Sequence, residues 1–342
     1  MPALGSELVT LADVAKSKDK QIGKVAEVLV QSNAMLNDIG YMEMNEGTIH
    51  KEDIRSALPE VYYRKANQPI PASKSTIEER TFQASHFESK SQIDEAVAKR
   101  GGMDRIAYNR WNQAQGHLQA HGQELADLMI YGSPSTSNMK TAGFMDIYST
   151  LATTEETSKQ IIDAGGTGSD NCSILKVHWG ERSVFGIYPK GTNAGLTRVD
   201  RTPSSGSLVK IEGLDENGNA GSFWGYEENF LTDHGLVVKD YRQAARVANI
   251  DVSNLVSGAG AADLIDLMIS ANYKIDSLEN GSGAWYVNRT IFAHLHKQAL
   301  TKVGAGAGLT YENFEGKPIL MFLGDPVRLM DALLNSEAQV TS

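Results

Sequence analysis

The sequence has a single cysteine in 342 residues and no long apolar run. One thiol cannot form a disulfide within the chain, and cysteine-rich zinc sites are excluded. The residues around Cys172 are apolar, which predicts a buried and unreactive thiol. No stretch approaches the roughly 20 apolar residues of a membrane-spanning helix, so no membrane partner is expected. Charged residues interrupt the first turns of the chain, so we expect no secretory signal and synthesis in the cytosol.

Basic residues are also in short supply, since 32 Lys and Arg stand against 42 Asp and Glu, a net charge of -10. Sequence-reading DNA binding generally needs a basic patch, so this balance argues against it. It is compatible with a container for DNA, whose walls benefit from not gripping phosphates. With 41% hydrophobic residues, the chain is apolar enough to bury a globular core.

The first 45 residues are predicted to form a helical arm. Thr10 and Asp13 have the spacing of a capping box, and Ile22, Val25 and Leu29 recur at helical spacing in one apolar stripe. A short amphipathic helix must bury such a stripe, on the body of its own subunit or on a neighbour. We expect Ile22, Val25 and Leu29 to lie at a subunit interface.

Residues 46–89 are polar and highly charged, and they hold three of the nine prolines. Strand-like residues 61–65 and 76–87 flank these prolines, which predicts a two-stranded arm that turns near residues 68–73. An isolated hairpin is marginal in water, so such an arm is expected to lie on a neighbouring subunit. A mobile loop is the alternative. The expected neighbour contacts are Tyr62, Tyr63, Arg64 and Lys65.

A long helix is predicted at residues 104–131, where apolar residues recur at intervals of three and four until Gly132 and Pro134 end the pattern. Ser91 and Asp94 predict the start of a shorter helix just before it. The other expected elements are a hairpin of residues 171–179 and 181–191, a second extended pair at 221–231 and 234–251, helices at 261–269 and 288–303, a buried strand at 319–323 and a final short helix. This mixture predicts an α+β fold.

Two groups of residues invite a chemical interpretation, and neither is convincing. The glycine-rich residues 165–170 precede a strand, whereas a phosphate loop follows a strand and opens a helix. His117, His121 and Glu124 share one face of the long helix with metal-ligand spacing, but a polar face turned to solvent or to a neighbour is the commoner explanation. We therefore predict no catalytic, cofactor-binding or metal-binding residues.

Several blocks of the sequence resemble the tailed-phage major capsid proteins that have the Hong Kong 97-type fold. The blocks lie in order at residues 58–76, 161–196, 234–251, 285–299 and 315–334. The second is similar to that family's passage from a glycine-rich loop into a strand pair and a Tyr-Pro-Lys-Gly turn. The last is similar to its closing strand and Gly-x-Pro-Val turn.

The resemblance implies a specific domain organisation. It places an N-terminal arm at 1–45, an extended loop at 46–89, a peripheral domain with a spine helix at 90–131, an axial domain at 132–304 and a return strand with the C-terminal peripheral segment at 305–342. The arm, hairpin and long helix predicted above follow in the same order.

The resemblance also implies a function, that of a major capsid protein and not of an enzyme. Its copies would form pentamers and hexamers of an icosahedral shell around double-stranded DNA, without sequence-specific contact. Scaffold, decoration and portal proteins are further expected partners. The expected location is the virion, after assembly in the host cytoplasm.

Three lysines of the extended loop raise the question of a covalent link, because some relatives join subunits through a Lys–Asn bond. They are Lys51, Lys65 and Lys74, but no partner asparagine or catalytic carboxylate stands out, so no cross-link is expected. Two alternative functions stay open: an encapsulin-type compartment that encloses protein cargo, and a soluble nucleotide-dependent enzyme that uses residues 165–170.

Overall fold

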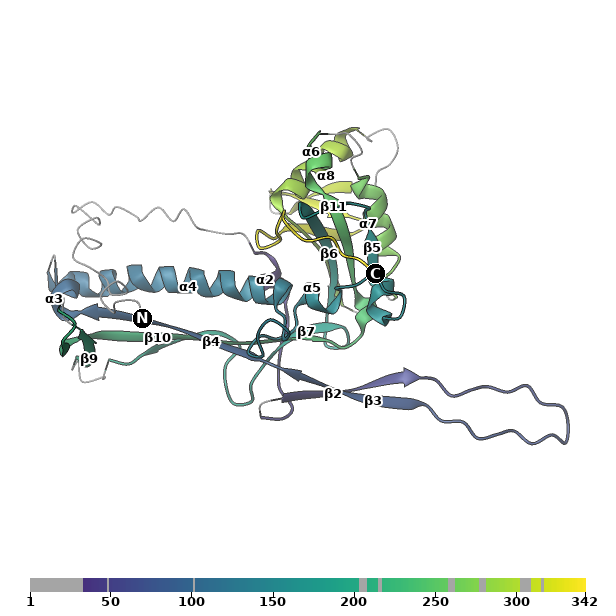
Figure 1. Ribbon diagram of the computed structural model, residues 1–342, viewed down its shortest axis with the longest axis horizontal. Coiled ribbons are helices and arrows are strands. Elements are labelled where there is room, and N and C mark those ends of the chain that lie inside the picture. The colour runs from purple at the N-terminus through teal and green to yellow at the C-terminus, as the bar shows by residue number, and fades with distance from the viewer. Residues whose placement is uncertain are drawn as a thin grey trace. The chain divides into compact units, whose positions relative to one another are not determined.

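The computed structural model describes residues 33–47, 49–100, 102–202, 208–214, 217–257, 262–276, 281–301, 309–314 and 317–342 (Figure 1). The chain divides into two compact units. The helix unit contains His86–Ala126 and Gly195–Asp233. The sheet unit contains Ser32–Ser85, Asp127–Ala194 and His234–Ser342. Part of the expected axial region 132–304, namely Gly195–Asp233, thus groups with the long helix.

The long helix α4 (Ile106–Tyr131) confirms the prediction from the apolar spacing. It follows a short 3-10 turn (Met103–Arg105) and α3 (Glu95–Ala98), whose N-cap is Asp94. The prediction that a helix starts at Ser91 is wrong, because Ser91 lies in β4 (Ser85–Asp94). Burial along β4 alternates from residue to residue, which is the period of a strand, and this pattern outweighs the local capping signal.

The helix unit is completed by a small antiparallel sheet. The second predicted extended pair is wrong in one respect, because its first segment and the start of its second form a single strand, β10 (Ala220–Val238). β8 (Gly195–Asp200) and β9 (Val209–Leu214) pair with β10, and β4 is its other neighbour. At Gly225 a side chain would meet the carbonyl oxygen of Ile93, so β4 and β10 approach closely only because this residue is glycine.

The sheet unit is built on strands that run through its core in the order β13-β14-β15-β12-β6-β7-β10, with β11 paired to β6 and β5, and β1 to β7. The strands are β1 (Tyr41–Glu43), β5 (Ile161–Asp163), β6 (Asn171–Trp179), β7 (Val184–Tyr188), β11 (Ala244–Asp251), β12 (Ser282–Val287), β13 (Leu309–Phe314), β14 (Lys317–Phe322) and β15 (Asp325–Leu329). The helices are α2 (Met35–Asp38), α5 (Phe144–Ile147), α6 (Val252–Ser257), α7 (Leu264–Asn272) and α8 (Arg289–Thr301).

Buried apolar side chains of α7, α8, β11 and β12 form one core cluster, which confirms the two predicted late helices. The cluster also contains Cys172, which is fully buried as predicted, and burial raises the pKa of its thiol.

One predicted strand pairing and one predicted helix in this unit are wrong. β6 and β7 do not form a hairpin but share one parallel bridge, Trp179 with Val184, because the turn between them sends β7 to pair with β10. The expected C-terminal helix is instead β15, which pairs in parallel with β12 and buries Val327. Strand pairing and burial override local propensity in both places.

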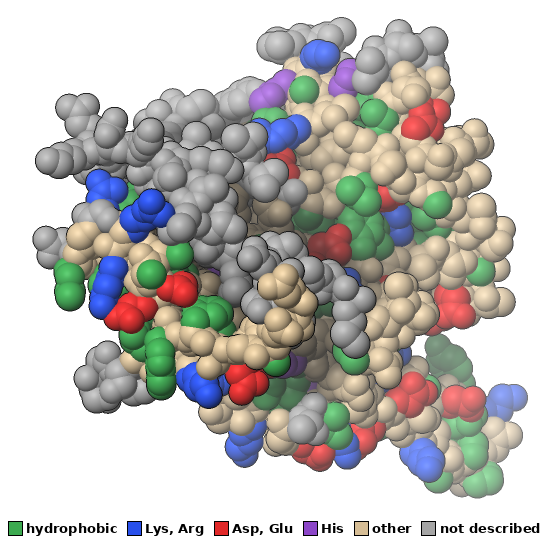
Figure 2. All heavy atoms as spheres, turned by 60° about the vertical axis from the view of Figure 1, so that its left-hand side comes forward, with side chains coloured by type: hydrophobic (Ala, Val, Ile, Leu, Met, Phe, Trp, Pro, Cys, Tyr) green, Lys and Arg blue, Asp and Glu red, His purple; other side chains and the backbone are tan. Residues whose placement is uncertain are grey.

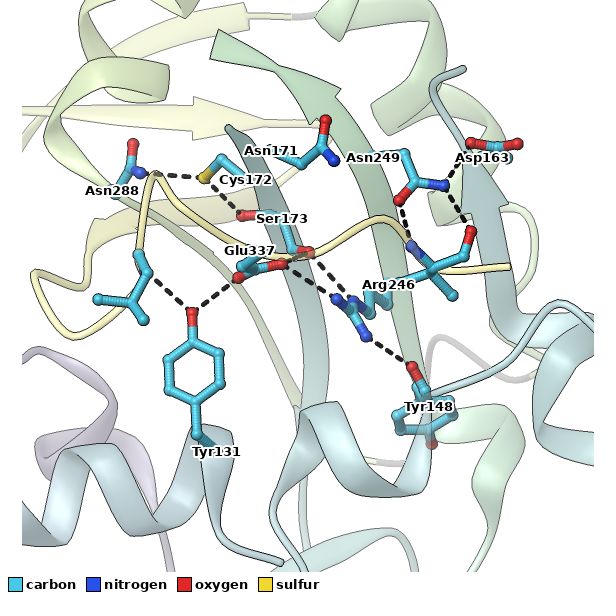
Figure 3. A network of polar contacts seen from close by, with 12 residues as sticks. Tyr131, Tyr148, Asp163, Asn171, Cys172, Ser173, Arg246, Asn249, Asn288 and Glu337 are labelled. Carbon is cyan, nitrogen blue, oxygen red and sulfur yellow. Dashed lines mark hydrogen bonds and ion pairs between the residues drawn. The ribbon is translucent and has the colours of Figure 1, made fainter. Parts of the chain in front are cut away.

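A buried polar network holds the C-terminal segment in the sheet unit (Figure 3). The carboxylate of Glu337 accepts hydrogen bonds from Arg246 Nη2 at 3.0 Å and from the Tyr131 hydroxyl at 2.7 Å. Arg246 also donates through Nε to Ser173 Oγ at 3.1 Å and through Nη1 to the carbonyl of Tyr148 at 2.7 Å. Each charge is therefore paired and hydrogen-bonded, as a buried charge must be.

We predict that Glu337→Gln destabilises the subunit by about 3–5 kcal/mol, since it leaves the Arg246 guanidinium buried without its counter-charge. Chemical denaturation of the free subunit measures this loss. Lys159→Gln is the matched control, because it breaks an ion pair with Glu156 in which both side chains lie in solvent, and it should change stability little. Equal effects of the two substitutions would contradict the prediction.

Candidate subunit interface

A two-stranded hairpin projects from the sheet unit (Figure 1). β2 (Ile49–Ala57) and β3 (Thr76–Gln83) pair antiparallel, with a register shift between Arg55 and Ala57. The arm is thus confirmed, and its second strand begins at residue 76 as predicted, but its first strand is β2 and not the predicted residues 61–65. Residues 61–65 are extended and unpaired, and the chain turns at Asn67, whose φ is 66°.

The prolines explain why the ladder stops. Pro59, Pro69 and Pro71 lack the backbone N–H that a strand pair requires, so residues 58–75 continue beyond the ladder as an open loop. We call these residues the tip.

The base of the hairpin is anchored in the sheet unit. Phe82 packs against the cluster of Met44, Phe185, Ile187 and Val237. His50, which is buried, contacts the Phe185 ring edge-on and lies 3.1 Å from the Glu52 carboxylate. That carboxylate also pairs with Lys239 Nζ at 2.5 Å.

Burial alone would raise the pKa of the Glu52 carboxyl, but its bonds to Lys239 and His50 outweigh burial and lower it. The base is therefore fixed by both apolar and ionic contacts.

The tip, in contrast, presents apolar side chains to solvent. Tyr63 is fully exposed and Val61 is 91% exposed, and Leu58, Ile70 and Tyr62 are also exposed. The tip carries three basic side chains and only one acidic one, in a chain whose net charge is -10. Exposed apolar residues that gather on one surface are typical of interaction sites, so the tip is a candidate interface.

The structure places four of the predicted contact residues together. Tyr62, Tyr63, Arg64 and Lys65 are consecutive and exposed near the turn of the tip. Ile22, Val25 and Leu29 lie outside the described residues. Sequence reasoning missed Leu58, Val61 and Ile70 as contact residues. Their signal was an apolar side chain in a polar segment, directly beside a proline at Leu58 and Ile70 and two residues after Pro59 at Val61.

A second exposed surface follows the outer face of α4. Its exposed members form two runs with a spacing of four residues, Ala107, Trp111 and Gln115 in the first and Gly116, Ala120 and Glu124 in the second. Successive helix residues point about 100° apart, so the two runs lie on different sides of the helix. We call the first run the outer stripe; its Trp111 is 47% exposed and is preceded one turn earlier by the small Ala107.

The histidines of α4 do not lie on this outer stripe. His121 is 5% exposed and His117 is half-buried, and both face β4 and β10. The expectation of a polar face turned to solvent or to a neighbour is therefore wrong for this pair. Within the described part of the chain, no group of three or more His, Cys, Asp or Glu side chains is placed to hold a metal ion.

The glycine-rich residues 165–170 are engaged by their own chain. Gly166 N donates to the carbonyl of Asn249 at 2.8 Å, and Gly165 N donates to Asp163 Oδ1 at 2.9 Å. The loop leads into β6 and not into a helix. Two backbone donors are thus used, and a carboxylate occupies the place where a phosphate would seek N–H groups.

Charge on one face of the molecule is mixed. On the face drawn in Figure 2, the described basic, acidic and hydrophobic side chains are interspersed, and none of these types forms one large region. This face does not present the basic patch typical of DNA-binding proteins. Of the helices in the described ranges, none has the length and apolar character that a bilayer crossing requires.

Comparisons with known proteins agree with the geometry. The family model described as major capsid protein GP7 matches residues 17–341. A chain in a near-atomic structure of bacteriophage Epsilon15 is 32% identical, with a TM-score of 0.76 and full coverage of both chains. No curated protein sequence matches significantly.

Other similar structures resemble the chain more distantly. A chain of the bacteriophage JBD30 capsid is 9% identical with a TM-score of 0.48, covering 84% of this chain and 90% of its own. The SrpI encapsulin of Synechococcus elongatus is also 9% identical, with a TM-score of 0.45, covering 71% of this chain and 97% of its own.

We predict that replacing both Val61 and Tyr63 by Ala changes the unfolding free energy of the free subunit by no more than about 0.5 kcal/mol, because these side chains are exposed. Chemical denaturation checks this. Phe185→Ala, at the anchored base, should cost about 3–5 kcal/mol in the same measurement. A large loss from the tip substitutions would show that the tip packs on its own chain.

Proposed function

Because the chain belongs to the family of major capsid protein GP7, it is a bacteriophage capsid subunit of the Hong Kong 97-type fold, and we propose that its hairpin tip fastens each copy to a neighbouring copy. The observation that carries the proposal is the contrast within the hairpin. Its base is packed and ion-paired, while its tip exposes Val61, Tyr63 and Ile70.

The tip supplies the kind of contact that a shell needs. Apolar area removed from water contributes roughly 25 cal/mol per Å², so a few side chains give only a modest free energy. In a closed shell every copy both gives and receives such contacts, and the whole becomes stable although each contact is weak. We infer pentamers and hexamers as the intermediate rings, with Tyr62, Tyr63, Arg64 and Lys65 as interface residues.

We further propose the outer stripe of α4 on a neighbouring copy as the surface that receives the tip. The small side chain of Ala107, one turn before Trp111, leaves room for the extended tip to lie close to the helix. Trp111 is exposed and can receive Arg64 or Lys65, because a cation above an aromatic ring is attracted to it.

The remaining parts of the chain fit roles around this contact. We propose residues 1–45 as an arm that reaches another copy, residues 90–131 as the peripheral domain and most of 132–304 as the axial domain, with residues 305–342 returning to the peripheral domain. Scaffold, decoration and portal proteins are the other partners we infer. The negative net charge suits a wall beside double-stranded DNA that is held without sequence-specific contact.

The capsid family is not an enzyme class, and we propose that the chain catalyses no reaction of its own. Of the loop lysines, Lys51 lies 3.5 Å from Glu46 and 3.4 Å from Glu79, so it is engaged in ion pairs. We keep the expectation of no covalent cross-link. The family match over residues 17–341 favours a virus shell over the protein-cargo compartment.

Replacing Tyr62, Tyr63, Arg64 and Lys65 together by Ala should abolish shell assembly while the subunit stays folded, because only the exposed tip changes. Sedimentation and negative-stain microscopy measure the fraction in shells, and circular dichroism checks the fold. The control replaces Glu155, Glu156 and Lys159, which are exposed in the sheet unit, and it should assemble normally. The proposal would be refuted if the tip variant formed shells in the same yield as the unmodified protein.

The receiving surface is tested by a cysteine pair, Tyr63→Cys with Trp111→Cys. Mild oxidation of assembled shells should give a ladder of covalently joined subunits on a non-reducing gel, since the two thiols would meet across the interface. The natural thiol of Cys172 is fully buried and does not compete. A matched pair, Tyr63→Cys with the exposed Met139→Cys, should give no ladder. Equal ladders, or none, would reject α4 as the receiving surface.

A further inference from the structure

Two histidines join α4 to the sheet of the helix unit. Ser89 Oγ on β4 lies 2.8 Å from His117 Nδ1 and 2.8 Å from His121 Nε2. On its other side, His121 Nδ1 lies 2.8 Å from Thr232 Oγ1 on β10. One helix and two strands are thus connected through four side chains.

All three contacts are satisfied when both imidazoles are neutral. The Thr232 hydroxyl donates to His121 Nδ1, the His121 Nε2–H donates to Ser89, and the Ser89 hydroxyl donates to His117 Nδ1. Protonation makes both nitrogens of an imidazole donors. A doubly protonated pair would therefore direct two cationic N–H groups at the single oxygen of Ser89.

Aromatic rings shield this group from water. His117 stacks on Phe230 with ring centroids 5.0 Å apart and an interplanar angle of 4°. His121 stacks on Phe87 at 5.3 Å. Phe230 and Thr232 are buried, so a charge that formed here would lose most of its hydration.

The surrounding charges do not compensate for protonation. Glu228 on β10 is the acidic group that acts on His117, but Arg198 holds its two oxygens at 2.9 and 2.8 Å, and Arg110 on α4 donates to it at 2.7 Å. Arg110 is also bound to Asp200 on β8.

Glu124 on α4 acts on His121, but its side chain is exposed, and the ring nitrogens of His121 lie against Ser89 and Thr232. Neither histidine is therefore held by a carboxylate of its own.

A third histidine, His86, lies on β4, the strand that carries Ser89, and provides an internal comparison. His86 lies 2.7 Å from Asp233 and 2.9 Å from Glu88. Its bonds to Glu88 and Asp233 raise the pKa of the His86 imidazole, so it accepts a proton readily. β4 thus carries an exposed histidine with acidic partners and faces one buried and one half-buried histidine with hydroxyl partners.

We propose that the hydrogen-bonded side chains of Ser89, His117, His121 and Thr232 form a pH-sensitive contact. This contact holds α4 against β4 and β10 at neutral pH and breaks when the two imidazoles are protonated. The ligand is the proton, and the consequence is local opening of α4 from its sheet. The contact is independent of the hairpin tip and does not rest on the interface proposed for it.

The direction of the effect follows from burial. Desolvation lowers the pKa of both His117 and His121 below the ordinary value of 6.5. The unfolded or opened state then binds more protons than the closed state. Closure is fully favoured above about pH 6.5 and weakens as the pH falls below it, by up to tenfold per pH unit for each histidine until its lowered pKa is reached.

Hydrogen–deuterium exchange of assembled shells tests the proposal. Peptides from residues 106–126 are followed between about pH 7.5 and about pH 5, with intrinsic exchange rates corrected for pH and β11 as the reference. Protection of α4 should fall at least tenfold while that of β11 stays constant. The double variant His117→Gln, His121→Gln, which keeps hydrogen-bonding groups but cannot be charged, should lose this pH dependence. His86→Gln should retain it.

Three results would overturn the proposal. They are constant protection of α4 in the unmodified protein, a parallel loss in β11 that indicates general acid unfolding, and an unchanged acid response in the double variant. If the double variant does not fold, the profile of the unmodified protein still decides, because it alone separates local opening of α4 from no response or general unfolding.

Discussion

The sheet unit depends on one buried carboxylate, that of Glu337. It is reached by Arg246 from β11, by Ser173 from β6 and by Tyr131 from the end of α4, so one side chain near the C-terminus fixes the positions of three elements. A buried charge is tolerated only when its partners are in place. The network therefore favours one position for the last residues. Val340 N donates to Asn249 Oδ1 at 2.7 Å and extends the network.

The hairpin differs from this network, because its base is buried within the folded chain whereas its tip is exposed. Its base belongs to the core through Phe82 and the Glu52–Lys239 pair, so the sheet unit sets the direction in which it leaves. Its tip exposes its apolar side chains, and the free energy of burying them is available only on association. In the arrangement proposed above, the subunit folds without the contacts of residues 58–75, and these residues become buried when copies associate.

The sequence allowed us to predict the features that depend on apolar periodicity and on the positions of prolines. The apolar spacing of α4 located it within two residues, and the prolines indicated an arm with Tyr62, Tyr63, Arg64 and Lys65 near its turn. Strand pairing depends on distant partners, so the single strand β10, the parallel bridge between β6 and β7 and the final strand β15 were missed. His117 and His121 were assigned to the wrong face because polar residues count as exposed until Ser89 and Thr232 supply their partners.

Charge then selects which contacts the shell uses. Subunits with a net charge of -10 repel one another at long range, and at physiological salt this repulsion is screened beyond roughly 8 Å. Copies can therefore approach one another. The tip differs in sign from the chain as a whole, because its three basic side chains outnumber its single Glu60. The proposed arrangement, which places the tip against Trp111 of a neighbour whose net charge is negative, combines apolar burial with attraction. Specificity in such a shell arises as much from the contacts that charge disfavours as from the one that it favours.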